Sequence, residues 1–321
     1  MKINSKIINA LKKSSVVAIF VHINPDGDCL GSASALCEAL QLLNKKVDIY
    51  CDDLISENYA FIKHINKVNS AKYSNYDLAI ALDSSEIHRI GKYSELFKKI
   101  KNTIKIDHHQ TREDYGNINV VEPVSSTCLI LYYYITELLG ELNDDIACSL
   151  YAGIACDTGS FLHSNTTYLE HEVAGKLLKY NFDLENLNYN LFKKTTLNQI
   201  KLFMIAYANL KFYSDNKIAV ITISKKDFDI TKTKKSDAGG IVNIAVNIEG
   251  VRVGIALCEE KKGLCSCSFR SNSSVDVSKI AEQFGGGGHK KSSGCNIFGH
   301  INTVTKKVVD ACNLQINNKE K

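Results

Sequence analysis

The chain has 321 residues, of which 45% are hydrophobic and 23% charged, and its formal net charge is +4. This composition is typical of a globular protein long enough for two domains. Two prolines against 19 glycines, with both signs of charge, exclude collagen-like and disordered classes. No segment approaches the roughly 20 apolar residues of a membrane span, and residues 16–21 are too short for a signal peptide. We therefore expect a cytoplasmic protein with no membrane partner.

The chain contains eleven cysteines without the spacing of a disulfide framework or of a zinc site. We expect them to be reduced thiols, most of them small core residues. The slight positive charge favours anionic partners only weakly.

The first half of the chain alternates short apolar segments with helical ones. The apolar segments are rich in Val and Ile, as expected for parallel strands buried on both faces, and cover residues 16–21, 47–51, 77–82 and 103–106. Helices are predicted over residues 30–43, 126–139, 144–156 and 167–179. The sequence therefore predicts an α/β domain with a parallel sheet.

Beyond about residue 185 the pattern changes. Residues 187–212 are predicted as one or two helices, and strands are predicted over 218–223, 251–258 and 264–269. A short helix follows over 276–284, with Asp276 as its N-cap. We expect a smaller α/β domain with a mixed sheet, and an active site in the cleft between the two domains. The expected divisions are a first domain over 1–190, a helical linker over 191–214 and a second domain over 215–321.

Histidines and aspartates gather directly after the predicted strands and at one helix end. In an open α/β sheet the carboxyl ends of the strands meet at one edge, so these side chains should converge. Converging carboxylates repel one another unless a cation lies among them, which predicts a metal site. The residues in these clusters are His22, Asp26, Asp28, Asp83, Asp107, His108, His109 and Asp157.

A ligand set of two imidazoles and four carboxylates drawn from these eight residues, without a thiolate, favours Mn²⁺ or Mg²⁺. Six ligands are too many for one ion with open positions, but they suit two ions about 3.5–4 Å apart. Such a pair makes hydroxide available near neutral pH and offsets the charge of a phosphate ester. The sequence therefore predicts hydrolysis of a phosphorus–oxygen bond.

A glycine run near the C-terminus leads into His289, and Arg270 precedes it by one short predicted helix. Glycine N–H groups can approach an anion closely, and arginine can bind phosphate through two hydrogen bonds. We predict a second, anion-binding pocket here; the alternative is a flexible helix C-cap.

The motifs, taken together, resemble those of the DHH phosphoesterase superfamily. In chain order, the N-terminal motifs are His22-x-x-Pro25-Asp26-x-Asp28-x-x-Gly31-Ser32, Asp83, Asp107-His108-His109, and Gly153-Ile154-x-x-Asp157-Thr158-Gly159. Towards the C-terminus, the chain resembles the DHH-associated domain at Phe269-Arg270-Ser271, Gly285-Gly286-Gly287-Gly288-His289 and Ser293-Gly294. In length and in the sequences of its motifs, the chain most resembles the bacterial nanoRNase/pAp phosphatase branch.

The resemblance implies two Mn²⁺ ions, for which Mg²⁺ or Co²⁺ would be substitutes. One ion would be held by His22 and Asp26, and the other by Asp28, His108 and Asp157. Asp83 would bridge the two ions.

The resemblance also implies roles for the remaining motif residues. His109 would face the substrate phosphate and protonate or steady the leaving group, while Asp107 would orient the histidines. In the second domain, the far phosphate or sugar of the substrate would be bound by Arg270, Ser271, Gly286, Gly287, Gly288 and His289. Lys290 and His163 depart from the family pattern and could change substrate preference without touching the metal set.

The implied reactions are hydrolysis of very short RNA to mononucleotides and of 3′-phosphoadenosine 5′-phosphate (pAp) to AMP. A cyclic-dinucleotide or linear pApA phosphodiesterase would use the same metals and stays an alternative, whereas an inorganic pyrophosphatase should lack the glycine run. A non-catalytic nucleotide-binding regulator is the alternative of another class, and the complete set of ligands argues against it. A homodimer is compatible with this interpretation, but the sequence does not decide the oligomeric state.

Overall fold

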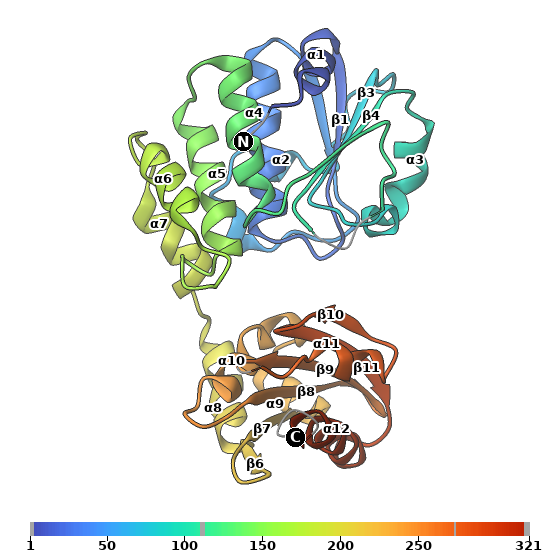
Figure 1. The fold of residues 1–321 in the computed structure, drawn as a ribbon, viewed down its shortest axis with the longest axis vertical. Helices are drawn as coiled ribbons and strands as arrows, with labels where there is room; N and C mark the ends of the chain where they lie inside the picture. Colours follow the sequence, from blue (N-terminus) through green and yellow to red (C-terminus); the bar gives the residue numbers. More distant parts are fainter. Residues whose placement is uncertain (1–2, 110–112, 273, 318–321) are drawn as a thin grey trace. The chain divides into compact units, whose positions relative to one another are not determined.

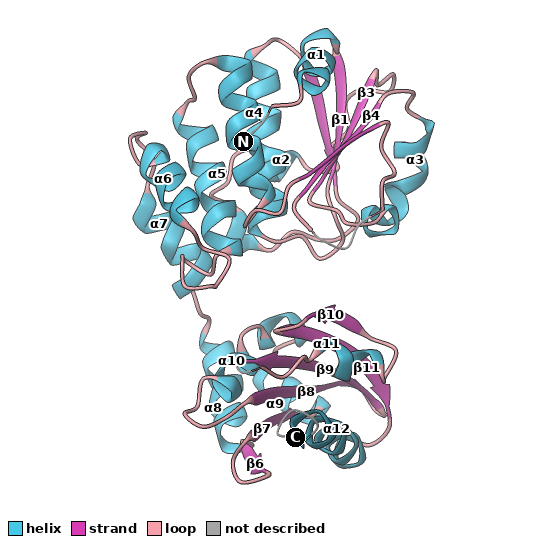
Figure 2. Cartoon of the chain, viewed as in Figure 1, coloured by secondary structure: helices cyan, strands magenta, loops and turns pink. Residues whose placement is uncertain are grey.

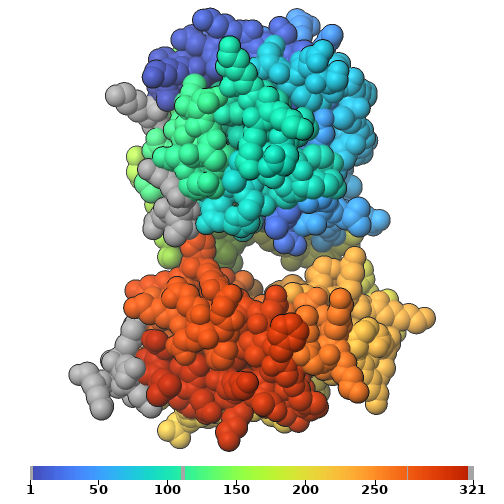
Figure 3. Space-filling view, turned by 90° about the vertical axis from the view of Figure 1, so that its right-hand side faces the viewer, coloured from blue at the N-terminus to red at the C-terminus, as the bar shows by residue number. Residues whose placement is uncertain are grey.

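The computed structural model describes residues 3–109, 113–272 and 274–317. The chain divides into two compact units, Met1–Lys194 and Thr195–Lys321. Each unit is built from one continuous stretch of chain, as the colours show in Figures 1 and 3.

The first unit contains a five-stranded, entirely parallel sheet in the order β2-β1-β3-β4-β5, which confirms the predicted parallel sheet. Because β2 and β3 lie on opposite sides of β1, the strand order reverses at the carboxyl ends of β1 and β3, where such folds bind ligands. The fifth strand was not predicted, because its segment has only four residues and one of them, Asn119, is polar. The strands are β1 (Val16–Phe20), β2 (Lys46–Tyr50), β3 (Leu78–Leu82), β4 (Thr103–Asp107) and β5 (Ile118–Val121).

Helices cover both faces of this sheet (Figure 2). On one face, α2 (Gly27–Leu42), α4 (Thr127–Leu139) and α5 (Asp144–Asp157) pack together over Ile19, Ile80 and Ile104 of the strands. On the other face, Phe97 of α3 (Ser94–Lys99) packs against Phe20 and the small residues of β3. The remaining helices of this unit are α1 (Ser5–Lys13), α6 (Tyr168–Leu177) and α7 (Leu184–Asn188).

Two glycines allow the helices around the metal motifs to approach closely. A Cβ at Gly31 of α2 would lie 2.4 Å from the carbonyl oxygen of Ser149 on α5, and one at Gly27 would lie 2.8 Å from Cβ of Cys156. No larger residue fits these positions without moving the helices apart. This close packing brings the N-terminus of α2 beside the C-terminus of α5.

The second unit contains a six-stranded sheet in the order β10-β11-β9-β8-β7-β6. Only β7 and β8 are parallel, so the sheet is mixed, as predicted. The strands are β6 (Lys211–Tyr213), β7 (Ile218–Ile223), β8 (Val253–Lys261), β9 (Leu264–Ser271), β10 (Gly287–His289) and β11 (Ser292–Phe298). One face is covered over β7 and β8 by α8 (Leu197–Ala208), α9 (Lys225–Thr231) and α10 (Ile241–Val246), and the other by α11 (Ser278–Glu282) and α12 (Ile301–Asn317).

Several predicted details differ from the structure. The N-cap position of α11 is Val277, so the prediction for Asp276 is wrong; Asp276 instead accepts hydrogen bonds from the backbone N–H and hydroxyl of Ser278. Residues 187–212 include a π-helical turn, Tyr189–Lys193, before Thr196 caps α8. The glycine run continues into β10, which sequence reasoning missed because glycine- and serine-rich strands lack an apolar alternation. Within the described residues, no helix is long and apolar enough to cross a membrane.

Candidate metal centre

Asp83 lies at the centre of the histidine and aspartate cluster. It directly follows β3, and its backbone adopts the left-handed conformation, with φ 54°. One carboxylate oxygen lies 3.3 Å from Nε2 of His22, and the other lies 3.4 Å from Nε2 of His108. The hydroxyl of Thr127 also donates to Asp83 at 3.1 Å. The strained backbone thus aims two oxygens at two histidines, as a bridging ligand requires.

Asp28 and Asp157 complete the side of the cluster that contains His108. Nε2 of His108 lies 3.2 Å from a carboxylate oxygen of Asp157, the last residue of α5. Asp28 is fully buried and accepts backbone N–H groups of Thr127 and Cys128 at 2.6 and 2.8 Å. These donors belong to the first turn of α4, where the helix dipole favours a negative charge. Ligand atoms of Asp28, His108 and Asp157 lie within 4.8 Å of one another.

His22 and Asp26 lie on the other side of Asp83. Nε2 of His22 is 3.9 Å from an oxygen of Asp26, which caps α2 by accepting the N–H groups of Asp28 and Cys29. Nδ1 of His22 lies 2.7 Å from the carbonyl oxygen of Ile23, so this nitrogen is assigned the proton. Nε2 therefore presents its lone pair to the cluster, as a metal-binding imidazole must.

The charges of the cluster fit a bound cation. Burial, reinforced by the neighbouring Asp83, raises the pKa of Asp28 to about 7. Burial and the nearby Asp28 also raise the pKa of Asp157 well above its ordinary value. Burial alone would lower the pKa of His108, yet the surrounding carboxylates raise it to about 10. Negative charge is therefore concentrated here, and a divalent cation would relieve the repulsion.

Sequence reasoning missed two residues of the site. The thiol of Cys29 lies among the ligand atoms of His22 and Asp83, but burial raises its pKa to about 12, which disfavours the thiolate. Nη2 of Arg89 lies 3.2 Å from Nδ1 of His22, and the Arg89 carbonyl accepts the N–H of Ile23 at 2.7 Å. The position of Cys29 directly after Asp28 was a usable signal. Nothing in the sequence pointed to Arg89, because the fold alone brings it beside β1.

His109 differs from His108 in its surroundings. Nδ1 of His109 lies 2.7 Å from one oxygen of Asp107 and 3.7 Å from Asp83. Asp107 is fully buried and, among the described residues, belongs to none of the groups that could hold a metal ion. His109 itself forms such a group with Asp83 and His108. Asp107 holds its Nδ1, so Nε2 is the ring nitrogen that is not bound to Asp107.

In the second unit, three adjacent strands place two of the predicted anion-binding residues, Arg270 and His289, in one row. Arg270 of β9 pairs with Ser292 of β11, which pairs in turn with His289 of β10. Paired residues point to the same face, so Arg270 and His289 share a face, about 10 Å apart across two strand spacings. Arg270 is half-buried and donates to the carbonyl of Phe269, whereas His289 is exposed. Ser271, the next residue along β9, is buried and pairs with Val253.

The positions of the glycine run differ in whether their surroundings require glycine. A Cβ at Gly286 would lie 2.2 Å from the carbonyl oxygen of Gly294, and Gly288 has φ 138°. A Cβ at Gly287 would meet nothing within 4 Å. The flexible-cap alternative therefore does not describe Gly286 and Gly288, which the hairpin itself requires. Beside them lies a pocket of about 410 Å³, whose lining includes Lys235, Ser266, Ser268, Gly285, Gly286 and Asn296.

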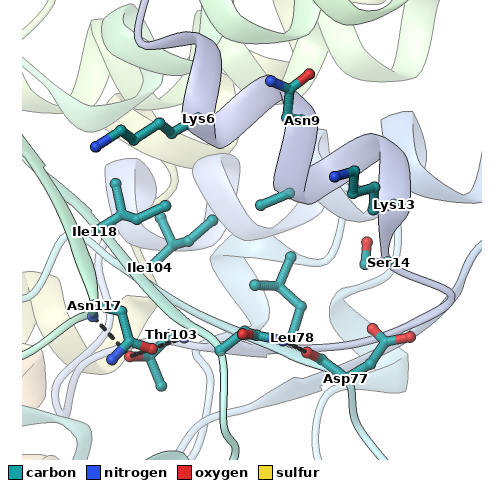
Figure 4. A pocket seen from close by; sticks show the side chains of 12 residues that line it. Lys6, Asn9, Lys13, Ser14, Asp77, Leu78, Thr103, Ile104, Asn117 and Ile118 are labelled. Carbon is teal, nitrogen blue, oxygen red and sulfur yellow. Dashed lines mark hydrogen bonds between the residues drawn. The ribbon is translucent and has the colours of Figure 1, made fainter.

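Another cavity, of about 510 Å³, lies between α1 and the amino ends of the strands (Figure 4). Lys6, Lys13 and Asn9 stand at its rim, and Leu78 and Ile104 line it. It lies at the opposite end of the sheet from Asp83 and contains no cluster of metal-binding side chains. It is therefore not part of the candidate metal centre.

Comparison with known proteins identifies two domains in the chain. Residues 16–154 match the model described as "DHH family, N-terminal domain", and residues 206–314 match the DHHA1 domain. The chain is 28% identical over 298 residues to the bifunctional oligoribonuclease and PAP phosphatase NrnA of Bacillus subtilis, covering 92% of this chain and 93% of that one. The NrnA of Mycoplasma genitalium is also 28% identical, covering 91% of this chain and 92% of that protein.

A solved structure supports the fold. The crystal structure of an exopolyphosphatase-related protein from Bacteroides fragilis has a TM-score of 0.92 and 22% identity, and the match covers 99% of this chain and 97% of that one. The two matched models show that the chain contains a DHH domain followed by a DHHA1 domain, the two domains that its motifs resemble.

Proposed function

We propose that this protein is a Mn²⁺-dependent phosphoesterase that hydrolyses very short RNA to mononucleotides and pAp to AMP. The observation that carries the proposal is the position of Asp83 between His22 and His108. The two NrnA relatives, named as oligoribonuclease and PAP phosphatase, supply the substrate class.

The donor set supports the assignment of two ions. His22 and Asp26 would hold one, while Asp28, His108 and Asp157 would hold the other. Asp83 would bridge them. When bound, the ions supply hydroxide near neutral pH and offset the charge of the phosphate. Oxygen and imidazole donors suit Mn²⁺, with Mg²⁺ or Co²⁺ as substitutes.

His109 is the candidate catalytic acid. Hydroxide attacks phosphorus, the bond from phosphorus to the leaving oxygen breaks, and that oxygen keeps the electron pair. Nε2 of His109 then donates a proton to the leaving oxygen, while Nδ1 stays on Asp107. Arg270, Ser271, His289 and the glycines Gly286, Gly287 and Gly288 would bind the substrate away from the scissile phosphate.

A substrate panel tests the proposed function. Purified protein with Mn²⁺ is assayed on pAp, RNAs of two to five nucleotides, pApA, cyclic di-AMP and pyrophosphate. Rapid hydrolysis of pAp and the short RNAs is expected. Preference for cyclic di-AMP or pApA would favour the alternative phosphodiesterase, and binding of all nucleotides without turnover would favour a regulator.

Cellular location and oligomeric state belong to the same proposal. All eleven cysteines are free thiols, most of them buried, as expected in a reducing compartment, so we place the enzyme in the cytoplasm. A homodimer is the assembly that we would test first, by light scattering of the metal-loaded protein.

A further inference from the structure

Lys105, in the middle of β4, is a lysine with no exposed surface. Its neighbours along the strand, Ile104 and Ile106, point into the core beneath α2 and α4, so Lys105 points to the opposite face. There it pairs with Ala81 of β3, whose small side chain leaves room for the lysine stem. An apolar residue would fill this space at lower cost, because a buried ammonium group must find acceptors to replace water.

The ammonium group has four partners. It donates to the carbonyl oxygens of Ser85 and Glu113 at 2.9 and 3.0 Å, and it lies 5.1 Å from the centre of the Tyr115 ring. It also lies 3.2 Å from Oδ2 of Asp107, which is likewise fully buried. Through this ion pair Lys105 contacts the DHH motif.

The other oxygen of Asp107 holds His109. Oδ1 lies 2.7 Å from Nδ1 of His109, and it also accepts the backbone N–H groups of His108 and His109 at 3.0 and 3.3 Å. A carboxylate can only accept hydrogen bonds, so Nδ1 carries the proton and the ring orientation is set. Lys105, Asp107 and His109 therefore form a continuous chain of contacts from the core of the sheet to the edge of the metal centre.

We infer that Lys105 is a positioning residue for His109, and that it acts by fixing the Asp107 carboxylate. Without the ammonium group, Oδ2 of Asp107 would lose its ion pair with Lys105, and the carboxylate would be free to rotate. This rotation would release Nδ1 of His109 and misalign Nε2 with the leaving oxygen. This inference rests on the proposed function, since it needs a reaction in which His109 meets a leaving group.

The test compares two adenosine phosphodiesters that differ in their leaving groups. ApA must release a ribose hydroxyl, whereas adenosine 5′-(p-nitrophenyl phosphate) releases nitrophenolate, which needs no proton. The variants are Lys105→Met, His109→Ala and the double variant. Thr103→Val is the matched control, because Thr103 is also buried, lies on the same face of β4 and bonds to Asn117 instead of Asp107.

If Lys105 positions His109, Lys105→Met should lower kcat on ApA by roughly 10- to 100-fold, within the usual range for acid–base groups. Its KM on ApA and its bound Mn²⁺ should stay near the wild-type values, and kcat on the nitrophenyl ester should fall less than about threefold. In the His109→Ala background, Lys105→Met should cause no further loss on ApA, because both changes remove the same interaction. Thr103→Val should change kcat on both substrates by the same factor, if it changes kcat at all.

Three outcomes would overturn the inference: equal losses of kcat on the two substrates, full additivity in the double variant, or loss of Mn²⁺ from Lys105→Met. If Lys105→Met does not fold, Lys105→Gln is tested in its place. The side-chain amide of the glutamine can still donate to the carbonyl oxygens of Ser85 and Glu113. Failure of both variants to fold would show that the lysine serves the fold itself, which also contradicts a positioning role. If the wild-type protein cleaves neither diester, the proposed function fails first.

Discussion

Gly153 of α5 faces Asp28 of α2 so closely that a Cβ at position 153 would lie 2.8 Å from a carboxylate oxygen of Asp28. The same Cβ would lie 2.2 Å from the sulfur of Cys128, whose backbone N–H holds that carboxylate oxygen. The absence of a side chain at Gly153 is thus a condition for the geometry of the metal centre. In the motif Gly153-Ile154-x-x-Asp157, the glycine leaves room for the carboxylate of Asp28 at the interface between α5 and α2.

The first prediction follows from this contact. Gly153→Ala should displace Asp28 and lower the stability of the first unit, by about 1–3 kcal/mol as for other overpacked cores. Bound metal, measured by elemental analysis, should fall in the fraction that remains folded. Gly175→Ala is the matched control: a Cβ there would meet nothing within 4 Å, and Gly175 lies within α6. Alanine should stabilise that helix by about 0.5–1 kcal/mol. Normal metal content in Gly153→Ala would contradict the prediction.

The second prediction concerns metal bridging. Asp83→Ala should abolish hydrolysis of every substrate and reduce the bound metal from two ions per chain, because both sides of the cluster share this carboxylate. Metal content and turnover are measured on the same sample. Asp145→Asn, which changes an exposed carboxylate paired with Lys63, should leave both unchanged. Near-normal turnover of Asp83→Ala would rule out the two-metal assignment.

The third prediction separates substrate binding from cleavage. Arg270→Ala should weaken the binding of nucleotide substrates roughly 10- to 150-fold, which is equivalent to losing a charge-assisted contact of about 1.5–3 kcal/mol. A minimal ester such as p-nitrophenyl phosphate, if cleaved, should lose much less, because it lacks the nucleoside and second phosphate that Arg270 is proposed to bind. The measured quantity is the ratio of the two losses in kcat/KM. A ratio near one would mean that Arg270 has only a structural role.

The fourth prediction concerns pH and stability. His64 is buried, with Nε2 2.8 Å from a carboxylate oxygen of Glu38. Burial lowers its pKa below the ordinary 6.5, despite the opposing effect of Glu38. The unfolded chain therefore binds the proton more readily than the folded chain. His64 thus contributes stability that is complete above about pH 6.5 and lost as the pH falls through its folded-state pKa.

Urea unfolding of the metal-free protein between pH 5 and 7.5 measures this effect. The difference in unfolding free energy between wild type and His64→Gln should grow as the pH rises, with a slope of at most about 1.4 kcal/mol per pH unit. His88→Gln, which changes an exposed histidine, is measured under the same conditions for comparison. A difference that is constant with pH would contradict the prediction.

The fold could be predicted where local pattern and tertiary environment agree. Residues 78–82 are apolar at every position, and they form β3, which is buried throughout. The segment 287–298 could not be predicted, because glycine and serine carry little strand preference by themselves. Its two strands form through pairing, β11 with β9 and β10 with β11. The same pairing gives Gly286 its steric role, which composition alone could not show.

The sequence by itself determined which side chains would converge at the edge of the parallel sheet, because each of them follows a strand or ends a helix whose pattern is strong. The tertiary structure decided which atoms meet. Only the fold turns the two oxygens of Asp83 towards different histidines, places Arg89 beside His22 and brings the carbonyl oxygens of Ser85 and Glu113 to the buried Lys105. Contacts of this kind join residues from separate elements, and their geometry depends on how strands and helices pack, which no local pattern of residues specifies.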